Sequence, residues 1–353
     1  MTQLNGTNHQ ETIKILECIR ERKTANNQEI QKCLKDLFGD ISRTTVVRDI
    51  NRLLEENLIE KKGEGRSVRY EELVKNELLS YFDADKYFEN GPDERSVAFE
   101  RFNFDIFKNL KDIFTLEEIS ELKELNNAYN ARIKKMPASA IKKEFERITI
   151  ELSWKSSHIE GNTYSLIDTE ILIKNREEAQ GHKREEAVMI LNHKKALEYI
   201  LGERKDFRKL NLRKIEDIHR IIVEGLGVQH GIRKGLVGVV GTRYKPLDNE
   251  HQINEAVEKT VKIINGLNDC FSKALVGLAM ISYIQPFEDG NKRTSRLLTN
   301  SILLADDACP LSFRSIDEGD YKKAIIIFYE QNSIRMLKQL FIQQFKFVVK
   351  NYF

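Results

Sequence analysis

A short polar segment near the end of the chain, residues 285–296, carries residue types that bind phosphate. Apolar runs at 274–281 and 297–304 flank it, so we predict that it connects two buried helices and opens the second. The start of a helix has unpaired backbone N–H groups and partial positive charge, and both attract anions. Gly290 allows a close approach of the backbone, and Lys292, Arg293 and Arg296 add positive charge.

The spacing of the charged residues indicates how such a phosphate site is built. Arg293 and Arg296 stand three apart, so on a helix they share a face and can clamp two phosphates. Asp289 lies among these cations, where a carboxylate can hold a Mg²⁺ ion that bridges phosphate oxygens. The alternative is a charged helix start with surface arginines, because a single glycine loop is weak evidence.

Residues 285–296 closely resemble the signature of the Fic (Fido) family, His-Pro-Phe-x-Asp/Glu-Gly-Asn-Gly/Lys-Arg-x-x-Arg. Members of that family transfer AMP, or another phosphate-containing group, from a nucleotide to a protein hydroxyl. The resemblance implies ATP and Mg²⁺ as ligands, with Asn291 among the nucleotide-binding residues and Tyr321 beside the adenine. Gln285 stands where the family signature has its catalytic histidine.

The replacement at position 285 removes the general base that the family uses. A glutamine amide has no accessible basic pKa, although its carbonyl can accept a hydrogen bond from a hydroxyl. Losing a positioned base costs roughly a hundred- to ten-thousand-fold in rate. We therefore interpret the chain as a nucleotide-binding pseudoenzyme, with degenerate or very weak transfer, in which Gln285 marks the catalytic position. Two alternatives stay open: an active, autoinhibited adenylyltransferase acting on Ser, Thr or Tyr, and a glutamine introduced to inactivate the protein.

A second motif, Ser156-Ser157-His158-Ile159-Glu160-Gly161, resembles the inhibitory motif of the same family, Ser/Thr-x-x-x-Glu-Gly/Asn. Ser156 and Glu160 are four apart and share a helix face, and Gly161 is a plausible C-cap. The resemblance implies autoinhibition, in which Glu160 pairs with Arg296 and competes with the terminal phosphate for its guanidinium group. The alternative is an ordinary helix end with an exposed glutamate.

Residues 231–246 contain valines, glycines and a proline, which favour a β-hairpin over a helix. This segment resembles the flap of the Fic family, which positions a target peptide by strand addition. A protein target would therefore bind here. A plain surface hairpin is the alternative.

The front of the chain, residues 10–72, has a different pattern. Apolar residues recur at helical spacing in three runs: Ile13, Ile15, Leu16 and Ile19; Ile30, Leu34 and Leu37; Val46, Val47, Ile50, Leu53, Leu54 and Leu58. Ser42 is a candidate N-cap of the third helix, and residues 59–70 alternate like a basic hairpin. Three helices followed by a hairpin predict a winged helix-turn-helix.

The positions of the basic residues predict how this module would bind DNA. The third helix would present Arg43, Thr44, Thr45 and Arg48 to the major groove, and the wing would place Lys61, Lys62, Arg66 and Arg69 near phosphates. Winged helices also bind proteins, so that alternative stays open.

The fold class predicted for the whole chain is mainly α: a Fic helical bundle with a small β-hairpin flap, preceded by a winged helix-turn-helix. We expect a winged helix at 10–72, a helical connector at 73–118 and a Fic domain at 119–350 that includes motifs 156–161 and 285–296. Predicted bundle helices are 116–135, 138–160, 165–175, 184–202, 211–226, 251–284, 291–305 and 318–350.

Composition sets the remaining expectations. The 353 residues, 41% of them apolar, suffice for two packed domains. No run approaches the length of a membrane span and the N-terminus is polar, so we expect no membrane partner and a cytoplasmic location. The net charge of +2 does not identify a partner, and a homodimer stays open.

Overall fold

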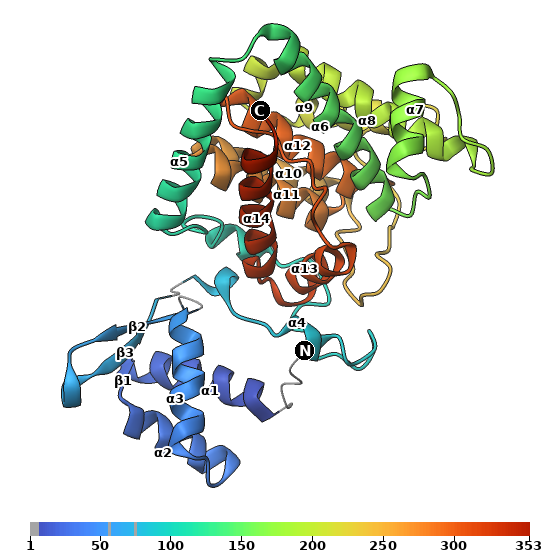
Figure 1. The fold of residues 1–353 in the computed structure, drawn as a ribbon. Coiled ribbons are helices and arrows are strands. Elements are labelled where there is room, and N and C mark those ends of the chain that lie inside the picture. The colour runs from blue at the N-terminus through green and yellow to red at the C-terminus, as the bar shows by residue number, and fades with distance from the viewer. Residues whose placement is uncertain (1–6, 56–57, 74–75) are drawn as a thin grey trace. The chain divides into compact units, whose positions relative to one another are not determined.

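The computed structural model describes residues 7–55, 58–73 and 76–353, with side chains from residue 14 onward except those of Leu37 and Arg66. The chain divides into two compact units, residues 1–91 and 92–353 (Figure 1). The stretch predicted as a connector, 73–118, is shared between them. Among the described residues, no helix has both the length and the hydropathy required to cross a membrane.

The first unit has the predicted arrangement of three helices and a small antiparallel sheet. Its elements are α1 (Thr7–Arg22), β1 (Thr24–Ala25), α2 (Asn27–Phe38), α3 (Arg43–Glu55), β2 (Ile59–Lys62) and β3 (Arg69–Glu72), followed by a 3-10 turn (Glu77–Leu79) and α4 (Ala84–Tyr87). The strand order is β1-β3-β2, and Lys61 of β2 pairs with Tyr70 of β3. Between β2 and β3 the wing tip makes a 3-10 turn at Gly65–Ser67. This is a winged helix.

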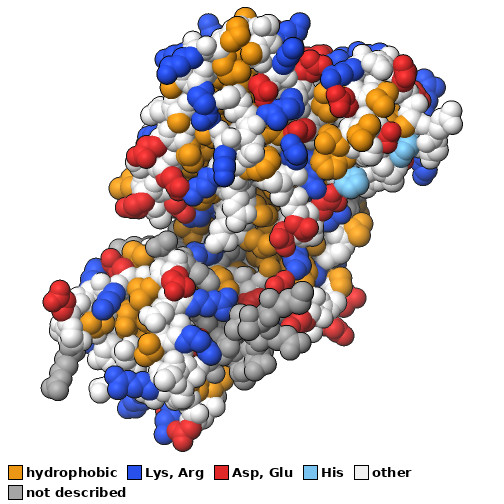
Figure 2. Space-filling view, in the orientation of Figure 1, with side chains coloured by type: hydrophobic (Ala, Val, Ile, Leu, Met, Phe, Trp, Pro, Cys, Tyr) orange, Lys and Arg blue, Asp and Glu red, His pale blue; other side chains and the backbone are white. Residues whose placement is uncertain are grey.

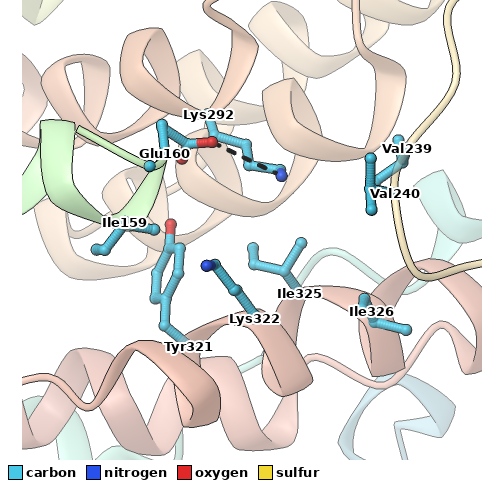
Figure 3. Close-up of a pocket in the computed structure, with 10 residues that line it drawn as sticks. Ile159, Glu160, Val239, Val240, Lys292, Tyr321, Lys322, Ile325 and Ile326 are labelled. Carbon is cyan, nitrogen blue, oxygen red and sulfur yellow. Dashed lines mark ion pairs between the residues drawn. The ribbon is translucent and has the colours of Figure 1, made fainter. Parts of the chain in front are cut away.

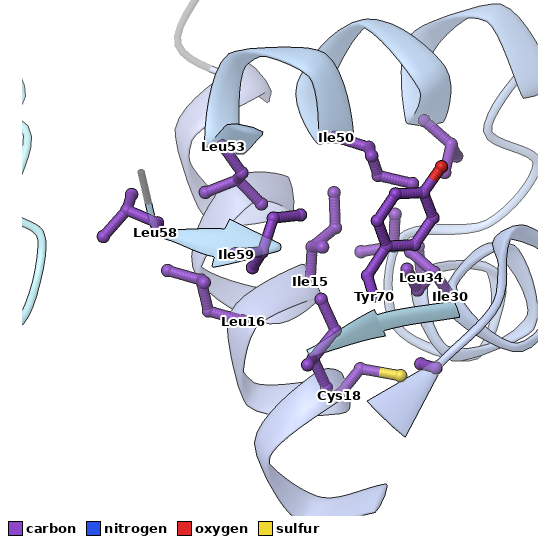
Figure 4. Packing of buried hydrophobic residues seen from close by; sticks show 13 residues of the cluster. Ile15, Leu16, Cys18, Ile30, Leu34, Ile50, Leu53, Leu58, Ile59 and Tyr70 are labelled. Carbon is purple, nitrogen blue, oxygen red and sulfur yellow. The ribbon is translucent and has the colours of Figure 1, made fainter. Parts of the chain in front are cut away.

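Helix capping and one apolar core fix the first unit. The Asn26 side chain accepts from the Glu29 N–H while the Glu29 carboxylate accepts from the Asn26 N–H, which forms a capping box. Ser42 caps α3 as predicted, since its hydroxyl accepts from the Thr45 N–H at 3.1 Å. The core, drawn in Figure 4, contains the predicted apolar positions Ile15, Leu16, Ile19, Ile30, Leu34, Val46, Ile50, Leu53 and Leu58. The side chains of Ile13 and Leu37 lie outside the described part.

The second unit is a bundle built around two consecutive buried helices, α11 (Cys270–Ile284) and α12 (Asn291–Ala305), which pack on each other and carry the 285–296 segment between them (Figure 1). The surrounding helices are α5 (Leu116–Ile133), α6 (Ala138–Ile159), α7 (Leu166–Asn175), α8 (Arg184–Gly202), α9 (Leu212–Val223), α10 (Glu250–Gly266), α13 (Glu318–Gln331) and α14 (Arg335–Asn351). Two 3-10 helices, Phe104–Lys108 and Arg204–Arg208, complete the unit.

Two of the predicted helices are wrong as single elements. The expected helix 251–284 is two helices, because Asp269 caps the N-terminus of α11 by accepting from the Ser272 N–H at 2.8 Å. The expected helix 318–350 breaks at Asn332, which takes a left-handed conformation with φ 51°. The Asn332 side chain accepts from Asn103 at 3.0 Å, so a contact distant in sequence holds this break.

The predicted hairpin at 231–246 is also wrong, because the structure has no strand there; the segment forms only an isolated bridge between Arg101 and Lys245. Side chains replace a β-ladder as its anchors. The buried Arg233 donates to the carbonyl oxygens of Gln285 at 2.7 Å and Gly235 at 2.6 Å, and Arg95 donates to Gly241 O at 2.5 Å. We call residues 231–246 the flap segment.

Candidate functional site

The loop between α11 and α12 is held in one conformation by Asn291 and Gly290. Asn291 accepts from the Phe287 N–H at 2.9 Å and donates to the Phe287 carbonyl at 2.8 Å, so its amide closes the loop on itself. Gly290 caps α12 with φ 79°, and a Cβ at this position would lie 3.2 Å from Val223 Cγ1. A side chain is therefore excluded twice, by backbone conformation and by packing.

Gly290→Ala is expected to destabilise the second unit by about 1–3 kcal/mol, because left-handed strain adds to the contact with Val223. Gly202→Ala is the control, since a Cβ there meets nothing within 4 Å. Denaturant unfolding of the whole chain, followed by the fluorescence of its one tryptophan, measures both; that residue, Trp154, lies on α6 of the second unit. Equal stability of the two variants would contradict this account of Gly290.

Beneath the loop lies His219, a residue of α9 that the sequence analysis did not single out. Its ring stacks on Phe287 with centroids 3.8 Å apart, and its Nε2 lies 2.9 Å from the Asp289 carbonyl oxygen. Since a carbonyl can only accept, Nε2 carries the proton. Burial lowers the pKa of His219 to about 4, so the ring is neutral and positions the loop through stacking and this hydrogen bond.

The 285–296 segment meets the predicted inhibitory motif through Arg296. The Arg296 guanidinium is fully buried and donates to Glu160 Oε1 at 2.8 Å, to Ser156 Oγ at 2.9 Å and to Ser156 O at 2.8 Å. The ion pair expected from the resemblance is therefore present. Lys292 adds a longer contact of 3.8 Å to Glu160 Oε2.

The end of α6 presents Glu160 in a defined position. The Gly161 N–H donates to His158 O at 2.9 Å and the Asn162 N–H to Ser157 O at 3.1 Å, with Gly161 at φ 95°. These two bonds form a Schellman motif, so the predicted glycine C-cap is present. Burial alone would raise the pKa of Glu160, but the positive charges of Arg296 and then Lys292 outweigh it and hold the pKa below its usual value. The carboxylate is therefore ionised at neutral pH.

His193 of α8 extends the contact between α6 and α12. Its Nδ1 lies 2.9 Å from Met189 O and therefore carries the proton, which leaves Nε2 to accept from the Ser156 hydroxyl at 2.8 Å. The Ser156 oxygen in turn accepts from Arg296 Nε. Burial lowers the pKa of His193 to about 3, which keeps the ring neutral and the chain of hydrogen bonds intact.

Gln285 ends α11 in a left-handed conformation with φ 51°. Its amide nitrogen donates to Ser282 O at 2.6 Å and lies 3.3 Å from the Tyr329 hydroxyl, while Arg233 donates to its backbone carbonyl. The side chain is 7% exposed. An amide held in this way has no proton-accepting nitrogen to offer a substrate hydroxyl.

A pocket of about 330 Å³ lies beside this network (Figure 3). It is lined by Ile159, Glu160, Gly161, Val239, Val240, Lys292, Tyr321, Lys322, Ile325 and Ile326. In the close-up, Glu160 and Lys292 lie together at one end, and Val239, Val240 and Ile326 lie at the other. The pocket thus joins a charged end to an apolar wall.

Several buried polar atoms at the site lack a hydrogen-bond partner of normal geometry among the described residues; they include Arg293 Nη1, Arg296 Nη1, the Tyr321 hydroxyl, Thr294 Oγ1 and His219 Nδ1. The guanidinium carbon of Arg296 lies 5.6 Å from the centre of the Tyr321 ring, so these two groups are close together. Buried polar groups are normally paired, so unpartnered donors beside a pocket mark a candidate binding site.

Comparison with known proteins agrees with this geometry. Residues 209–303 match the Fic/DOC family. The chain contains a Fic domain. Two curated relatives carry the name protein adenylyltransferase Fic: that of Nematostella vectensis is 28% identical over 203 residues, covering 53% of this chain and 45% of the relative, and that of Aedes aegypti is 30% identical over 174, covering 47% and 34%. This chain thus spans less than half the length of either.

Solved structures support the same fold. A Fic domain containing signaling protein from Bacteroides thetaiotaomicron aligns with a TM-score of 0.54 at 22% identity, covering 65% of this chain and 95% of that one. Fic-1 from C. elegans aligns with a TM-score of 0.58 at 17% identity, covering 66% and 71%. At the other end of the chain, residues 10–95 match the penicillinase repressor family, so the first unit is a repressor-like winged helix.

The signature contains two adjacent carboxylates, Glu288 and Asp289, and Asp289 is the predicted metal ligand. Asp289 is 64% exposed at its side chain and accepts from Arg293 at 2.8 Å. The described residues contain no group of three or more His, Cys, Asp or Glu side chains that could hold a metal. Mg²⁺ is commonly bound by one or two carboxylates together with substrate phosphates, so Asp289 fits as its protein ligand only when a nucleotide is present.

In the winged helix, some of the residues predicted to contact DNA form ion pairs within the protein and others do not. Arg43 and Thr44 on α3 and Lys61 on the wing are exposed, Thr45 is half-buried, and neither Arg43 nor Lys61 has an ion pair among the described residues. Arg48 pairs with Asp49, Lys62 with Glu60 and Glu71, and Arg69 with Glu29 and the Thr24 carbonyl. The Arg66 side chain lies outside the described part. Acidic and basic side chains are interspersed on the face shown in Figure 2.

The two buried histidines of the Fic domain predict a fall in stability with acid. Each has a folded pKa below the usual 6.5, so the unfolded chain binds protons first and stability decreases as pH falls from 6.5 toward 4 for His219 and toward 3 for His193. At pH 5 the loss is of the order of 1–2 kcal/mol for each histidine. Urea unfolding at pH 7 and 5 through Trp154 fluorescence measures it; His193→Gln and His219→Gln should each flatten the dependence, and an unchanged slope would contradict the assignment.

Proposed function

We propose that the Fic domain binds a nucleoside triphosphate, ATP with Mg²⁺, and that the chain is a regulator whose winged helix binds DNA while AMP transfer is degenerate or very weak. The observation that carries this proposal is the cluster of unpartnered donors on Arg293, Arg296 and Tyr321 beside a pocket with one charged and one apolar end. The charged end of the pocket suits phosphates, and the apolar end suits a purine. The names of the curated relatives support ATP as the nucleotide.

Nucleotide binding would compete with the Glu160–Arg296 ion pair. Arg296 Nη2 donates to Glu160 and to Ser156 O, Nε donates to Ser156 Oγ, and Nη1 has no hydrogen bond of normal geometry. A terminal phosphate can therefore begin to bind at Nη1 before the carboxylate is displaced. A guanidinium group can form two parallel hydrogen bonds with a carboxylate or with a phosphate, but not with both at once. A ligand shifts such an equilibrium only by its differential affinity for the two states. Autoinhibition in this chain is therefore a competition for one arginine.

The other residues of the Fic signature have separate roles in this proposal. Asn291 and Gly290 fix the loop so that the N–H groups at the start of α12 face an anion. A bound Mg²⁺ would neutralise phosphate charge, with Asp289 as its protein ligand. Gln285 cannot accept the proton of an attacking hydroxyl, so the site holds a nucleotide without the group that activates an acceptor.

Titration calorimetry with ATP and Mg²⁺ tests the proposal on the whole chain. Glu160→Gly is expected to bind ATP more tightly than the unmodified chain, because it frees Arg296. Glu177→Gly is the control, since Glu177 is an exposed loop glutamate remote in sequence from both motifs. If neither the unmodified chain nor Glu160→Gly binds ATP, the nucleotide-binding function is wrong.

DNA binding by the winged helix is tested separately. We expect the chain to shift a fragment of its own promoter in a salt-dependent manner, because phosphate contacts release counterions. Arg43→Ala should weaken the shift, since Arg43 is an exposed α3 residue without an ion pair among the described residues, whereas Lys135→Ala in the second unit should not. Absence of any salt-dependent shift would favour a protein partner for this module.

The second candidate function is an active adenylyltransferase under Glu160 control. The relatives favour it by name, and a protein target would bind at the flap segment. Stabilisation of charge by Asn291, Arg293 and the start of α12 survives the change at position 285. Incorporation of label from ATP that rises in Glu160→Gly, with Gln285 unchanged, would support this candidate.

A further inference from the structure

A lysine outside both motifs reaches the pocket from α13. Lys322 follows Tyr321 in the first turns of that helix, lines the pocket and is exposed. In Figure 3 its amine lies beside the ring of Tyr321. The pocket therefore has cationic side chains on two walls, Lys292 from α12 and Lys322 from α13.

The charged groups around the pocket differ in whether they are already neutralised. Of the two lysines that line the pocket, Lys292 lies 3.8 Å from Glu160. Lys322 has no ion pair within the described ranges. It is thus the lining lysine whose charge is not balanced by a neighbouring carboxylate.

The surroundings of Lys322 indicate what it would bind. Its neighbours on α13, Tyr321, Ile325 and Ile326, offer no acceptor for an ammonium group other than the Tyr321 hydroxyl. The one carboxylate that lines the pocket, Glu160, is already engaged by Arg296 and Lys292. A lysine is a flexible point charge that binds phosphate without the planar match an arginine needs. An anion entering from the pocket mouth would meet this charge before reaching the buried guanidinium groups.

We propose that Lys322 is a phosphate-binding residue of this site, which contacts the phosphate chain of the nucleotide from the α13 side, opposite the arginines of α12. This rests on the proposed nucleotide-binding function. This contact would make the site favour a nucleoside triphosphate over the nucleoside, because it adds affinity only for the phosphates. Bound nucleotide would then connect α13 to α12 across the pocket.

The test uses the full chain in the Glu160→Gly background, where ATP binding is expected to be tightest. Lys322→Gln is expected to weaken ATP binding roughly five- to tenfold, the effect of removing one charge-assisted hydrogen bond at a partly exposed position, and to leave adenosine binding unchanged. Lys322→Arg should retain most of the ATP affinity. Inorganic tripolyphosphate, measured directly, should also bind Lys322→Gln more weakly. Lys135→Gln, which removes a distant surface charge, controls for net charge.

The outcomes separate this inference from the function on which it rests. Unchanged ATP affinity in Lys322→Gln would overturn the role of Lys322 alone. Equal losses for ATP and adenosine would also overturn it, because they would indicate packing against the base. If Glu160→Gly binds neither ATP nor adenosine, the nucleotide-binding function itself fails and this inference fails with it.

Discussion

Gln285→His is expected to raise the rate of AMP transfer by about a hundred- to ten-thousand-fold when it is introduced into the Glu160→Gly variant. The imidazole would supply the general base that an amide cannot. The position can accept this residue: Gln285 has φ 51°, a left-handed conformation in which histidine is among the better tolerated side chains. The Ser282 carbonyl, which accepts from Gln285 at 2.6 Å, can accept one imidazole N–H and leave the other nitrogen free.

Labelled ATP measures this prediction as incorporation into the protein itself or into a lysate. Gln285→Asn, which keeps an amide, is the matched control and should remain as slow as the parent. Substantial and equal incorporation by Glu160→Gly with and without the histidine would show that position 285 does not limit transfer. That result would favour the active enzyme over the regulator.

The parts of the site that could be predicted from sequence are those that local rules determine. The helix start at 291, the glycine cap at Gly161 and the shared face of Ser156 and Glu160 each depend on a few consecutive residues. The Glu160–Arg296 ion pair joins residues 136 apart, and only the family resemblance implied it. The winged helix was predictable for the same reason, because its apolar spacing and the Ser42 cap each involve residues close together in the sequence.

The groups that the sequence did not reveal act through contacts distant in the chain. His193 and His219 lie on helices whose patterns give no sign of Ser156, Phe287 or the Asp289 carbonyl. A buried histidine that bonds to a backbone carbonyl has no distinctive neighbours in sequence. The only signal available was a polar residue on an otherwise apolar helix face, which does not specify its partner.

The errors in the predicted secondary structure have the same origin. Poor alternation at 231–246 left the hairpin without support, and the three carbonyl contacts of Arg233 explain why an irregular path is stable there. The helix breaks at Asp269 and Asn332 depend on one capping side chain and one left-handed residue. Hydrophobic periodicity alone does not place such breaks; the local signals were the polar residues Asn265-Gly266 and Asp269 at the first and Asn332-Ser333 at the second.

Arg296→Met is expected to destabilise the Fic domain by about 2–4 kcal/mol. The guanidinium is fully buried while the Glu160 side chain is 20% exposed. Removing the arginine therefore leaves a largely buried carboxylate whose remaining positive neighbours are Lys292 at 3.8 Å and the more distant Arg293. Burial would then dominate and raise the pKa of Glu160. The sign of its contribution to stability changes accordingly. In the unmodified chain, the Glu160–Arg296 pair stabilises the fold above the usual carboxyl pKa, and this stability is lost as the pH falls. In Arg296→Met, the unpaired Glu160 carboxylate destabilises the fold at neutral pH, and protonation in acid removes this destabilisation.

Arg296→Met combined with Glu160→Gln separates loss of the ion pair from loss of packing. Because the double variant has no unpaired charge, it should recover most of the stability. ATP binding should be lost in both variants, since neither retains the Arg296 guanidinium. Urea unfolding through Trp154 fluorescence at pH 7 measures the first effect and calorimetry the second. A double variant as unstable as Arg296→Met alone would indicate that the hydrogen bonds of Arg296 to Ser156, rather than its charge, hold α6 against α12.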